Sequence, residues 1–172
     1  MELIEAIKQR RSTRKFAERD VPDEILSKLL EYGNLAPSAG NLQARDFIVV
    51  KKKETREALA EAALGQEFVA EAPVVFVICT NERKISHYGT RGKSLYTYQD
   101  TAASAMILML AALEFGLGTC WVGAFDEEKV RKILGIPQHA RPVILIPIGY
   151  PAESPKMPPR KTQNEYVHME RW

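Results

Sequence analysis

The chain has 172 residues and a formal net charge of +2, from 24 Lys and Arg against 22 Asp and Glu. Apolar residues make up 45% and charged residues 27%, a composition that indicates a folded globular protein and excludes a disordered or fibrous chain. A net charge so close to zero provides no overall field that would draw the protein onto nucleic acid or a membrane surface. The most apolar segment, residues 102–113, is shorter than the roughly 20 residues that cross a bilayer, so we expect a core helix there.

The cysteines, the histidines and the first residues narrow the class of protein further. Cys79 and Cys120 lie far apart in apolar surroundings, which indicates reduced, buried thiols in a cytoplasmic protein. The three histidines are scattered, so we expect no metal site. The opening MELIEAIKQRR is acidic and amphipathic, which predicts no signal peptide. With neither repeat nor linker, residues 1–172 are expected to form one domain.

In the first half of the chain, periodicity and turn residues predict two helices, a loop and a strand–helix–strand unit. The VVFVICT strand is a continuous β-branched run, so it is expected to be buried on both faces. In order, the expected elements are helix 2–10, extended segment 10–16, helix 24–32 capped by Asp23, loop 36–43, strand 47–51, helix 53–64 and strand 74–80.

The second half is expected to open on a polar, mobile loop at residues 81–94 and to continue with the longest helix. That helix carries a face of only Ala, Leu and Met, so one side is expected to pack on the sheet and the other on a second subunit. The face consists of Ala102, Ala105, Met106, Met109 and Leu113. The expected elements are helix 95–115, strand 119–123, helix 127–134 capped by Asp126, strand 142–149 and a Pro-rich tail from residue 151.

The order of these elements predicts an α+β layered fold with a central mixed sheet, because strands alternate with helices but two helices precede the first strand. The tail contains too few apolar residues to fold alone, so it is expected to wrap another surface.

The densest positive charge is the segment RRSTRKF at residues 10–16. Arg10, Arg11, Ser12 and Arg14 combine guanidinium forks with a hydroxyl, which suits a dianionic phosphate. The same residues also fit a solvated turn between two helices, or a nucleic-acid arm, although neither a stacking platform nor a second basic face supports the arm.

Two further segments have the composition of a ligand site. Pro37, Ser38, Asn41 and Gln43 lie in a loop of small residues, where a flat ligand could approach the backbone and the two amides could meet a heterocycle edge. The segment at 118–124, GTCWVGA, places glycines at a strand end. Each segment also fits a plain loop or strand end, and neither a Rossmann nor a Walker motif is present.

Taken together and in this order, the segments resemble the FMN-dependent nitroreductase family of flavin oxidoreductases. RRSTRKF resembles the phosphate-binding segment of that family and APSAGNLQ its flavin-edge loop, while Gln66 before APVVFVI matches a flavin-contacting amide. GLGTCWVGAF resembles the strand and turn behind the isoalloxazine, and IPIGYPAE with PPRK and YVHMERW resembles the C-terminal signature. The resemblance covers nearly the whole chain.

The resemblance implies a nitroreductase-like layered fold with a mainly antiparallel sheet, and a homodimer whose C-terminal extensions wrap the partner. It implies FMN at the subunit interface, NADH or NADPH as reductant and a ping-pong reduction of a nitroaromatic, quinone, flavin or similar acceptor, with no catalytic side chain. By motif matching, the phosphate would contact Arg10, Arg11, Ser12, Arg14, Arg160 and Lys161. The ring would contact Gln43, Gln66, Val122, Gly123 and Ala124, with Pro37, Ser38 and Asn41 supplied by the partner subunit.

Some positions depart from the family pattern and leave alternatives open. Where the family often has Pro-Trp, this chain has Ala44 and Arg45, and Arg45 is expected either to contact a substrate or nicotinamide phosphate or to pair with Asp46 at the surface. The segment 80–98 is short and is expected to form a reduced lid, in which Tyr88, Arg91, Tyr96 and Tyr98 either contact substrate or pack the loop. A reductive dehalogenase-like member and a non-catalytic FMN-binding protein are the alternative functions.

Overall fold

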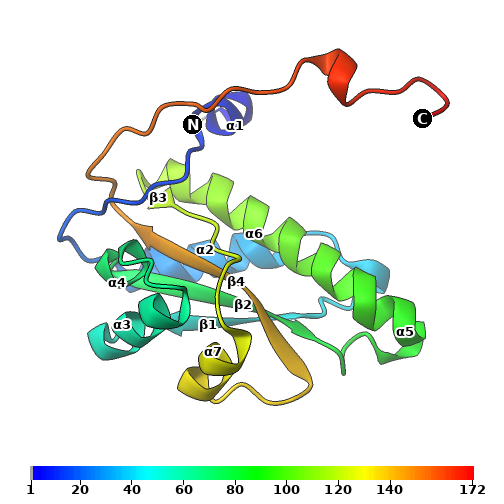
Figure 1. Cartoon of the computed structure of the whole chain (residues 1–172), viewed down its shortest axis with the longest axis horizontal. Helices are drawn as coiled ribbons and strands as arrows, with labels where there is room; N and C mark the ends of the chain where they lie inside the picture. Colours follow the sequence, from blue (N-terminus) through cyan, green and yellow to red (C-terminus); the bar gives the residue numbers. More distant parts are fainter. Residues whose placement is uncertain (1) are drawn as a thin grey trace.

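The computed structural model describes residues 2–172 and has a four-stranded antiparallel sheet at its centre (Figure 1). The strands lie in the order β1-β2-β4-β3. The longest two, β2 and β4, are runs of β-branched and other apolar residues, and β2 is buried along its whole length, as its sequence predicts. The strands are β1 (Arg45–Val50), β2 (Val74–Asn81), β3 (Gly118–Thr119) and β4 (Ala140–Gly149).

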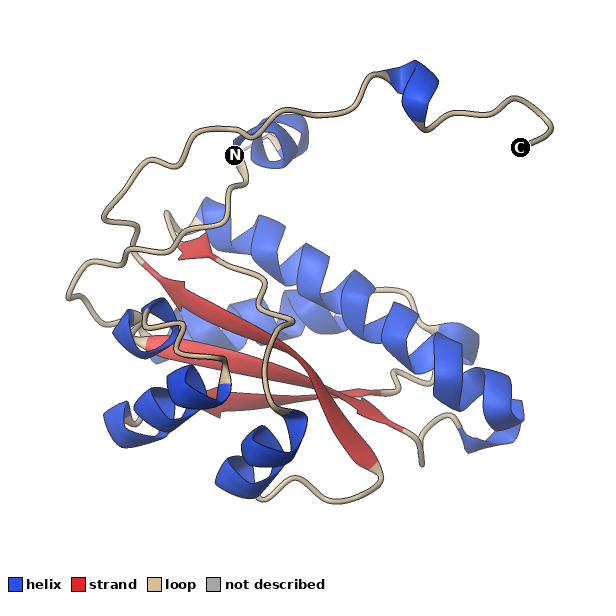
Figure 2. Cartoon of the chain, viewed as in Figure 1, coloured by secondary structure: helices blue, strands red, loops and turns tan. Residues whose placement is uncertain are grey.

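Helices cover both faces of this sheet, so the fold has three layers (Figure 2). Alternate residues of β2 face opposite layers: Val75 and Val77 join one core, and Phe76 and Ile78 join the other. The first core is completed by α3 (Lys53–Ala62), α4 (Phe68–Glu71) and α7 (Glu127–Leu134). The second is completed by α2 (Asp23–Asn34) and α6 (Thr97–Glu114). The expected α+β layered fold is confirmed, but its four strands all pair antiparallel rather than forming the mixed sheet that the order of elements predicted.

The long helix α6 is apolar on its outer side as well as its inner side. Ala105 and Met109 are buried against the sheet, whereas Met106 is exposed and Ala102 and Leu113 are partly exposed. The expected apolar face is therefore divided between the core and the surface. Beside α6 lies α1 (Leu3–Gln9), of which Leu3, Ile4 and Ile7 are each more than half exposed.

Several expected elements differ from the structure. Asp23 does not cap α2 through its side chain; it pairs with Lys51 at 2.6 Å. Residues 81–94 are not one loop, because a 3-10 turn at Ser86–Tyr88, a helical turn α5 (Gly89–Arg91) and a π-helical turn at Gly92–Tyr96 lead directly into α6. The strand expected at 119–123 is shorter, since β3 ends at Thr119 and only Val122 returns to β4. Asp126 caps α7 as expected, accepting the Lys129 N–H at 3.0 Å.

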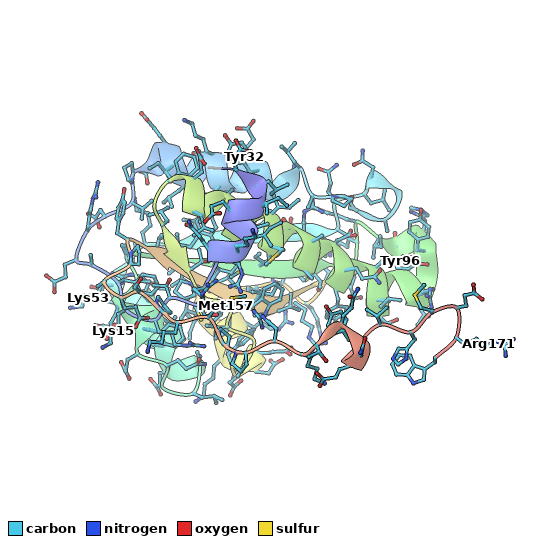
Figure 3. The ribbon with its side chains drawn as sticks, turned by 90° about the horizontal axis from the view of Figure 1, so that it is seen from above. Lys15, Tyr32, Lys53, Tyr96, Met157 and Arg171 are labelled. Carbon is cyan, nitrogen blue, oxygen red and sulfur yellow. The ribbon has the colours of Figure 1, made fainter. Side chains whose placement is uncertain are left out.

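After β4 the tail passes close to α1 and continues as an extended segment (Figure 1). Figure 3 shows it running from Met157 past the end of the body to Arg171. Its one short 3-10 turn among the described residues, Gln163–Glu165, is closed by a capping box between Thr162 and Glu165. Met157, Tyr166 and Trp172 are exposed, so the apolar side chains of the tail find no cover within their own chain.

Within residues 2–172, none of the helices combines the length and the hydropathy that a membrane-spanning segment requires.

Candidate functional site

The basic segment 10–16 lies along the β3 edge of the sheet as a short extended strand. The Thr13 N–H donates to the Thr119 carbonyl at 2.9 Å, and Ser12 forms a parallel bridge with Thr119. Gly118 permits this close approach, because a Cβ there would lie 2.8 Å from the Cβ of Thr13. The backbone of the segment is therefore held by the sheet with Thr13 buried, while Arg14 and Lys15 are exposed.

The start of the tail pairs with the same segment. Ala152 donates its N–H to the Lys15 carbonyl at 2.9 Å, Ala17 donates to Tyr150 at 2.8 Å, and the Arg14 N–H donates to the Glu153 carboxylate at 2.7 Å. These bonds turn the chain so that residues 155–160 pass back over residues 10–14. Two segments from opposite ends of the sequence thus meet at one place (Figure 1).

Between these two segments lies a cavity of about 470 Å³ in which positive charge predominates. Five of its lining side chains are cationic and none is acidic. We refer to it as the basic cavity. It is lined by Arg10, Arg11, Ser12, Arg14, Pro155, Lys156, Pro158 and Arg160. The structure therefore brings together the expected residues of the first segment with Arg160; Lys161 is not among the lining residues, and Lys156 takes a place that the sequence motifs did not indicate.

Neighbouring groups orient the cations of the basic cavity. Arg11 donates from Nη1 to the Lys8 carbonyl at 2.6 Å, and the Arg14 guanidinium lies 5.7 Å from the centre of the Phe68 ring. Burial raises the pKa of the Cys120 thiol, while Arg14, Ser12 and Arg10 oppose that rise. The thiol therefore lies beneath the basic segment, where it is uncharged at neutral pH.

The contact between Arg14 and Phe68 extends the site toward the segment after β3. Gln66, two residues before Phe68, donates from Nε2 to the Ala124 carbonyl at 3.1 Å and to the Ala63 carbonyl at 2.8 Å. Gly123 and Ala124 are exposed beside it. Val122 differs from this group: it is 3% exposed and exchanges both backbone hydrogen bonds with Leu145, so its side chain belongs to the core.

The loop 37–43 lies at the other end of α6. The Ala39 N–H donates to Asp100 near the start of that helix, whereas the basic segment contacts Gly118 and Thr119 just beyond its end. An 18-residue helix is about 27 Å long, so Pro37, Ser38, Asn41 and Gln43 are distant from the basic cavity within one chain. The expected site is thus divided into two halves.

Arg45 is neither of the things that the sequence suggested. It is 2% exposed, and its Nη2 donates to the carbonyls of Asn34 and Ala36 at 2.8 and 3.0 Å. Asp46 pairs instead with Lys84 at 2.6 Å. Arg45 is therefore a buried residue that bonds to the backbone ahead of the 37–43 loop.

The aromatic residues of the 81–98 segment pack against their neighbours. The Tyr88 side chain lies against Gly40, where an added Cβ would be 2.6 Å from the hydroxyl, and its ring meets Tyr96 edge to face at 5.4 Å. Arg91 donates from Nε to the Tyr96 hydroxyl at 3.1 Å. Tyr98 accepts from Arg141 at 2.6 Å. Of these residues, Tyr88 is the one that covers the 37–43 loop, at Gly40.

A comparison with known protein families shows to which family the chain belongs. The model described as "Nitroreductase family" matches residues 7–68 and 63–150, which include the basic segment and the 37–43 loop but not the tail residues that line the basic cavity. The chain belongs to the nitroreductase family.

Nitroreductase relatives cover most of the chain. An NADH dehydrogenase of Thermus thermophilus is 35% identical over an alignment 173 residues long that covers 84% of this chain and 84% of that protein. An FMN reductase [NAD(P)H] of Bacillus subtilis is 30% identical over 98% of this chain and 74% of its own. The solved structure of the NADPH:FMN oxidoreductase from Vibrio harveyi complexed with NAD⁺ superposes with a TM-score of 0.92 at 27% identity, covering 99% of this chain and 77% of that one.

Two contributors to this nitroreductase site carry no motif. Lys156 lies in the Pro-rich tail, and only the backbone pairing of the tail with the basic segment places it in the cavity. Phe68 belongs to the four-residue helix α4, whose apolar pattern is too short to be recognised. Among residues 2–172, no group of three or more His, Cys, Asp or Glu side chains could hold a metal ion.

Proposed function

We propose that this nitroreductase is an FMN-dependent oxidoreductase that uses NADH or NADPH to reduce a small organic acceptor, such as a nitroaromatic, a quinone or a flavin. The observation that carries the proposal is the basic cavity, whose five cations and one hydroxyl match a phosphate group. The names of the relatives from Bacillus subtilis and Vibrio harveyi, an FMN reductase and an NADPH:FMN oxidoreductase, support the same cofactor and reductant.

The basic cavity fits the phosphate of FMN in charge and in donors. Arg10, Arg14 and Arg160 would supply directed N–H groups from both ends of the chain, and Ser12 would add a hydroxyl donor. A phosphate carries close to two negative charges at neutral pH, so several cations are needed to offset the loss of its hydration. Lys161 follows Arg160 and would remain at the rim.

The surface formed by Gln66, Gly123 and Ala124 would lie along the ring of the cofactor. The Gln66 amide is held by the Ala63 and Ala124 carbonyls, so its free acceptor oxygen is fixed in direction. The chemistry that FMN supplies when bound is hydride exchange, first with NAD(P)H and then with the acceptor in a ping-pong order. The side chains of this protein would bind and orient, and none is required as a general acid or nucleophile.

A homodimer would complete the site. An apolar cavity of about 380 Å³ lies between α1, α2 and α6, and exposed apolar residues surround it, which is typical of an interface. In a two-fold dimer that pairs the α6 helices in antiparallel fashion, the 37–43 loop of one subunit would approach the basic cavity of the other. The exposed apolar tail would wrap the partner. The cavity is lined by Leu3, Ala6, Tyr32, Leu35, Ile107, Leu110, Ala111 and Glu114.

Residues 1–172 would form one FMN-binding domain. Its substrates would be small molecules, and neither nucleic acid nor a membrane would be a partner. The two free, buried cysteines support a reducing, cytoplasmic compartment.

Anaerobic mixing of the flavin-loaded protein with NADH or NADPH tests the proposal. The flavin absorbance is expected to bleach, and a panel of nitroaromatics, quinones and free flavin is expected to restore it. A flavin that binds but never bleaches would indicate a non-catalytic FMN-binding protein. If halogenated aromatics alone restore the flavin absorbance, the reductive dehalogenase-like alternative is favoured. A protein that takes up no flavin contradicts the proposal.

A further inference from the structure

The 37–43 loop has an unusual backbone. Gly40, Asn41 and Gln43 have φ values of 57°, 56° and 51°, in the left-handed region that side chains other than glycine seldom adopt. Such residues persist only where their surroundings determine the conformation, and they cluster at functional sites. Within the loop, Ser38 Oγ accepts the Gln43 N–H at 3.0 Å, and Gln43 Nε2 donates to the Asn41 carbonyl at 3.1 Å.

A buried carboxylate on α6 holds both ends of this loop. Asp100 is 3% exposed; its Oδ1 accepts the Ala39 N–H at 3.0 Å and its Oδ2 accepts the Ala44 N–H at 3.3 Å. One rigid helix therefore fixes the positions between which Asn41 and Gln43 lie. Hydrogen bonds to a charged acceptor are the stronger kind, which suits a strained loop.

A buried guanidinium holds the residues ahead of the loop. Arg45 Nη2 donates to the carbonyls of Asn34 and Ala36, while Nε and Nη1 are buried and have no hydrogen-bond partner. Burial lowers the pKa of Arg45 and the negative charge of Asp100 opposes that change, yet a guanidinium remains protonated in proteins. Arg45 thus keeps a positive charge that its hydrogen bonds satisfy only in part.

Stability alone gives little reason to keep these two charges in the interior. Replacing buried charges by apolar residues of similar volume is often neutral or stabilising, because ions lose their hydration on burial. An apolar side chain at position 45 would leave no buried nitrogen unbonded, at the cost of the two hydrogen bonds that Arg45 donates to the Asn34 and Ala36 carbonyls. The retained charges therefore point to a role at the surface that they support.

We propose that Arg45 and Asp100 are positioning residues that hold the 37–43 loop in the conformation that meets FMN, and that the Arg45 charge makes reduction of that FMN easier. The proposal rests on the proposed function. It deepens the proposed function by assigning the 37–43 loop a fixed shape before the cofactor arrives, and a buried positive charge two residues beyond Gln43. A positive charge in a poorly hydrated environment favours added negative charge nearby.

Arg45→Met, Arg45→Lys and Asp100→Asn test this inference, with Arg131→Met as matched control. Arg131 also donates to backbone carbonyls, those of Pro137 and Ala140 at 2.8 Å, but it lies on α7 across the sheet. The measurements are the FMN dissociation constant, the midpoint potential of the bound FMN and the unfolding temperature of the flavin-free protein. Arg45→Met and Asp100→Asn are each expected to weaken FMN binding by about tenfold or more, because each variant loses a charge-assisted hydrogen bond that holds the loop or the residues ahead of it.

The midpoint potential of the bound FMN distinguishes a positioning role of Arg45 from a purely structural one. Arg45→Met is expected to move the midpoint potential to more negative values, while Arg45→Lys keeps the charge and recovers most of the wild-type value. Arg131→Met is expected to lower only the unfolding temperature. The inference is overturned if Arg45→Met also changes only the unfolding temperature. Should Arg45→Met fail to fold, Asp100→Asn decides: wild-type FMN affinity in that variant overturns the inference. A wild-type protein that takes up no FMN instead contradicts the proposed function.

Discussion

Arg14 and Arg160 reach the basic cavity from opposite ends of the chain. We expect Arg14→Ala and Arg160→Ala each to weaken FMN binding by about 1–3 kcal/mol, because each removes a charge-assisted contact with the phosphate. Fluorescence titration of the flavin-free protein measures this change. Lys132→Ala, which removes an exposed cation from α7, is the control and is expected to leave the affinity unchanged. Unchanged affinity in both arginine variants would place the phosphate elsewhere.

Gly118 tests how the basic segment is held. An added methyl group would meet the buried Thr13 side chain at less than 3 Å, so Gly118→Ala is expected to displace the segment from β3 and to weaken FMN binding by about tenfold. Gly33→Ala is the control, since its methyl group would make ordinary contacts of 3.4 Å or more with Ser104 and Leu108. Equal FMN affinity in both variants would show that the position of Thr13 does not matter.

The sequence pointed to most of the candidate residues in both halves of the site, and the family resemblance supplied their expected roles. The charge density of RRSTRKF predicts an anion site, and the structure places four of its residues in one cavity. Lys156 could not be predicted, because backbone pairing rather than composition brings it there. Arg45 was expected either to contact a substrate or to pair with Asp46, and both alternatives are wrong because two carbonyls surround it in the interior, which no local sequence feature shows. Val122 is buried because the chain returns to β4 at that residue.

At the scale of elements, an ion pair joins α7 to the start of β4. Arg141 binds Glu127 through two bonds of 2.7 and 2.6 Å and also donates to Tyr98 on α6. These bonds lower the pKa of Glu127 below its ordinary value of 4.5. A carboxyl whose pKa is lower in the folded state contributes its stability above pH 4.5 and loses it as the pH falls through the lowered value.

We therefore expect Glu127→Gln to reduce the free energy of unfolding at pH 7 by about 0.5–1 kcal/mol, the range for a largely exposed pair. The difference from wild type should shrink as the pH falls below about 4.5, which urea unfolding across this range would measure. Glu128→Gln is the matched control, because Glu128 is more exposed and its pair with Arg131 is looser, with 3.8 Å between the Glu128 carboxylate and Arg131 Nε. A deficit that stays constant down to low pH would contradict this account.

Elements with strong periodicity or continuous apolar runs were predictable, and short polar ones were not. The β2 and β4 runs and the long α6 appear close to their expected bounds, because each buries its apolar residues in the core. The turns at 86–96 carry mostly polar residues with no apolar stripe, so the sequence suggested a loop. The β3 strand has only two residues because its pairing with β4 stops after Thr119 and returns only at Val122, opposite Leu145.

At the scale of the whole molecule, the halves of the site lie at opposite ends of α6, and apolar side chains of α1, α6 and the tail remain exposed. A single chain explains neither the separation of the two halves nor the exposed apolar side chains. A two-fold dimer along α6 would bring the halves of two subunits together and would cover those side chains. The fold was predictable from the order of its elements. The division of the site was expected only from the family resemblance, which assigned Pro37, Ser38 and Asn41 to the partner subunit, because sequence motifs alone give no distances between segments.

Sedimentation velocity with simultaneous detection of flavin absorbance tests the central claim most directly. We expect the wild-type protein and the control Val49→Glu, which alters an exposed residue of β1, to sediment as dimers carrying one FMN per chain. Ile107→Glu places a charge in the apolar cavity beside α6 and is expected to give folded monomers that have lost the flavin. A folded monomer that keeps FMN at wild-type affinity would contradict the account.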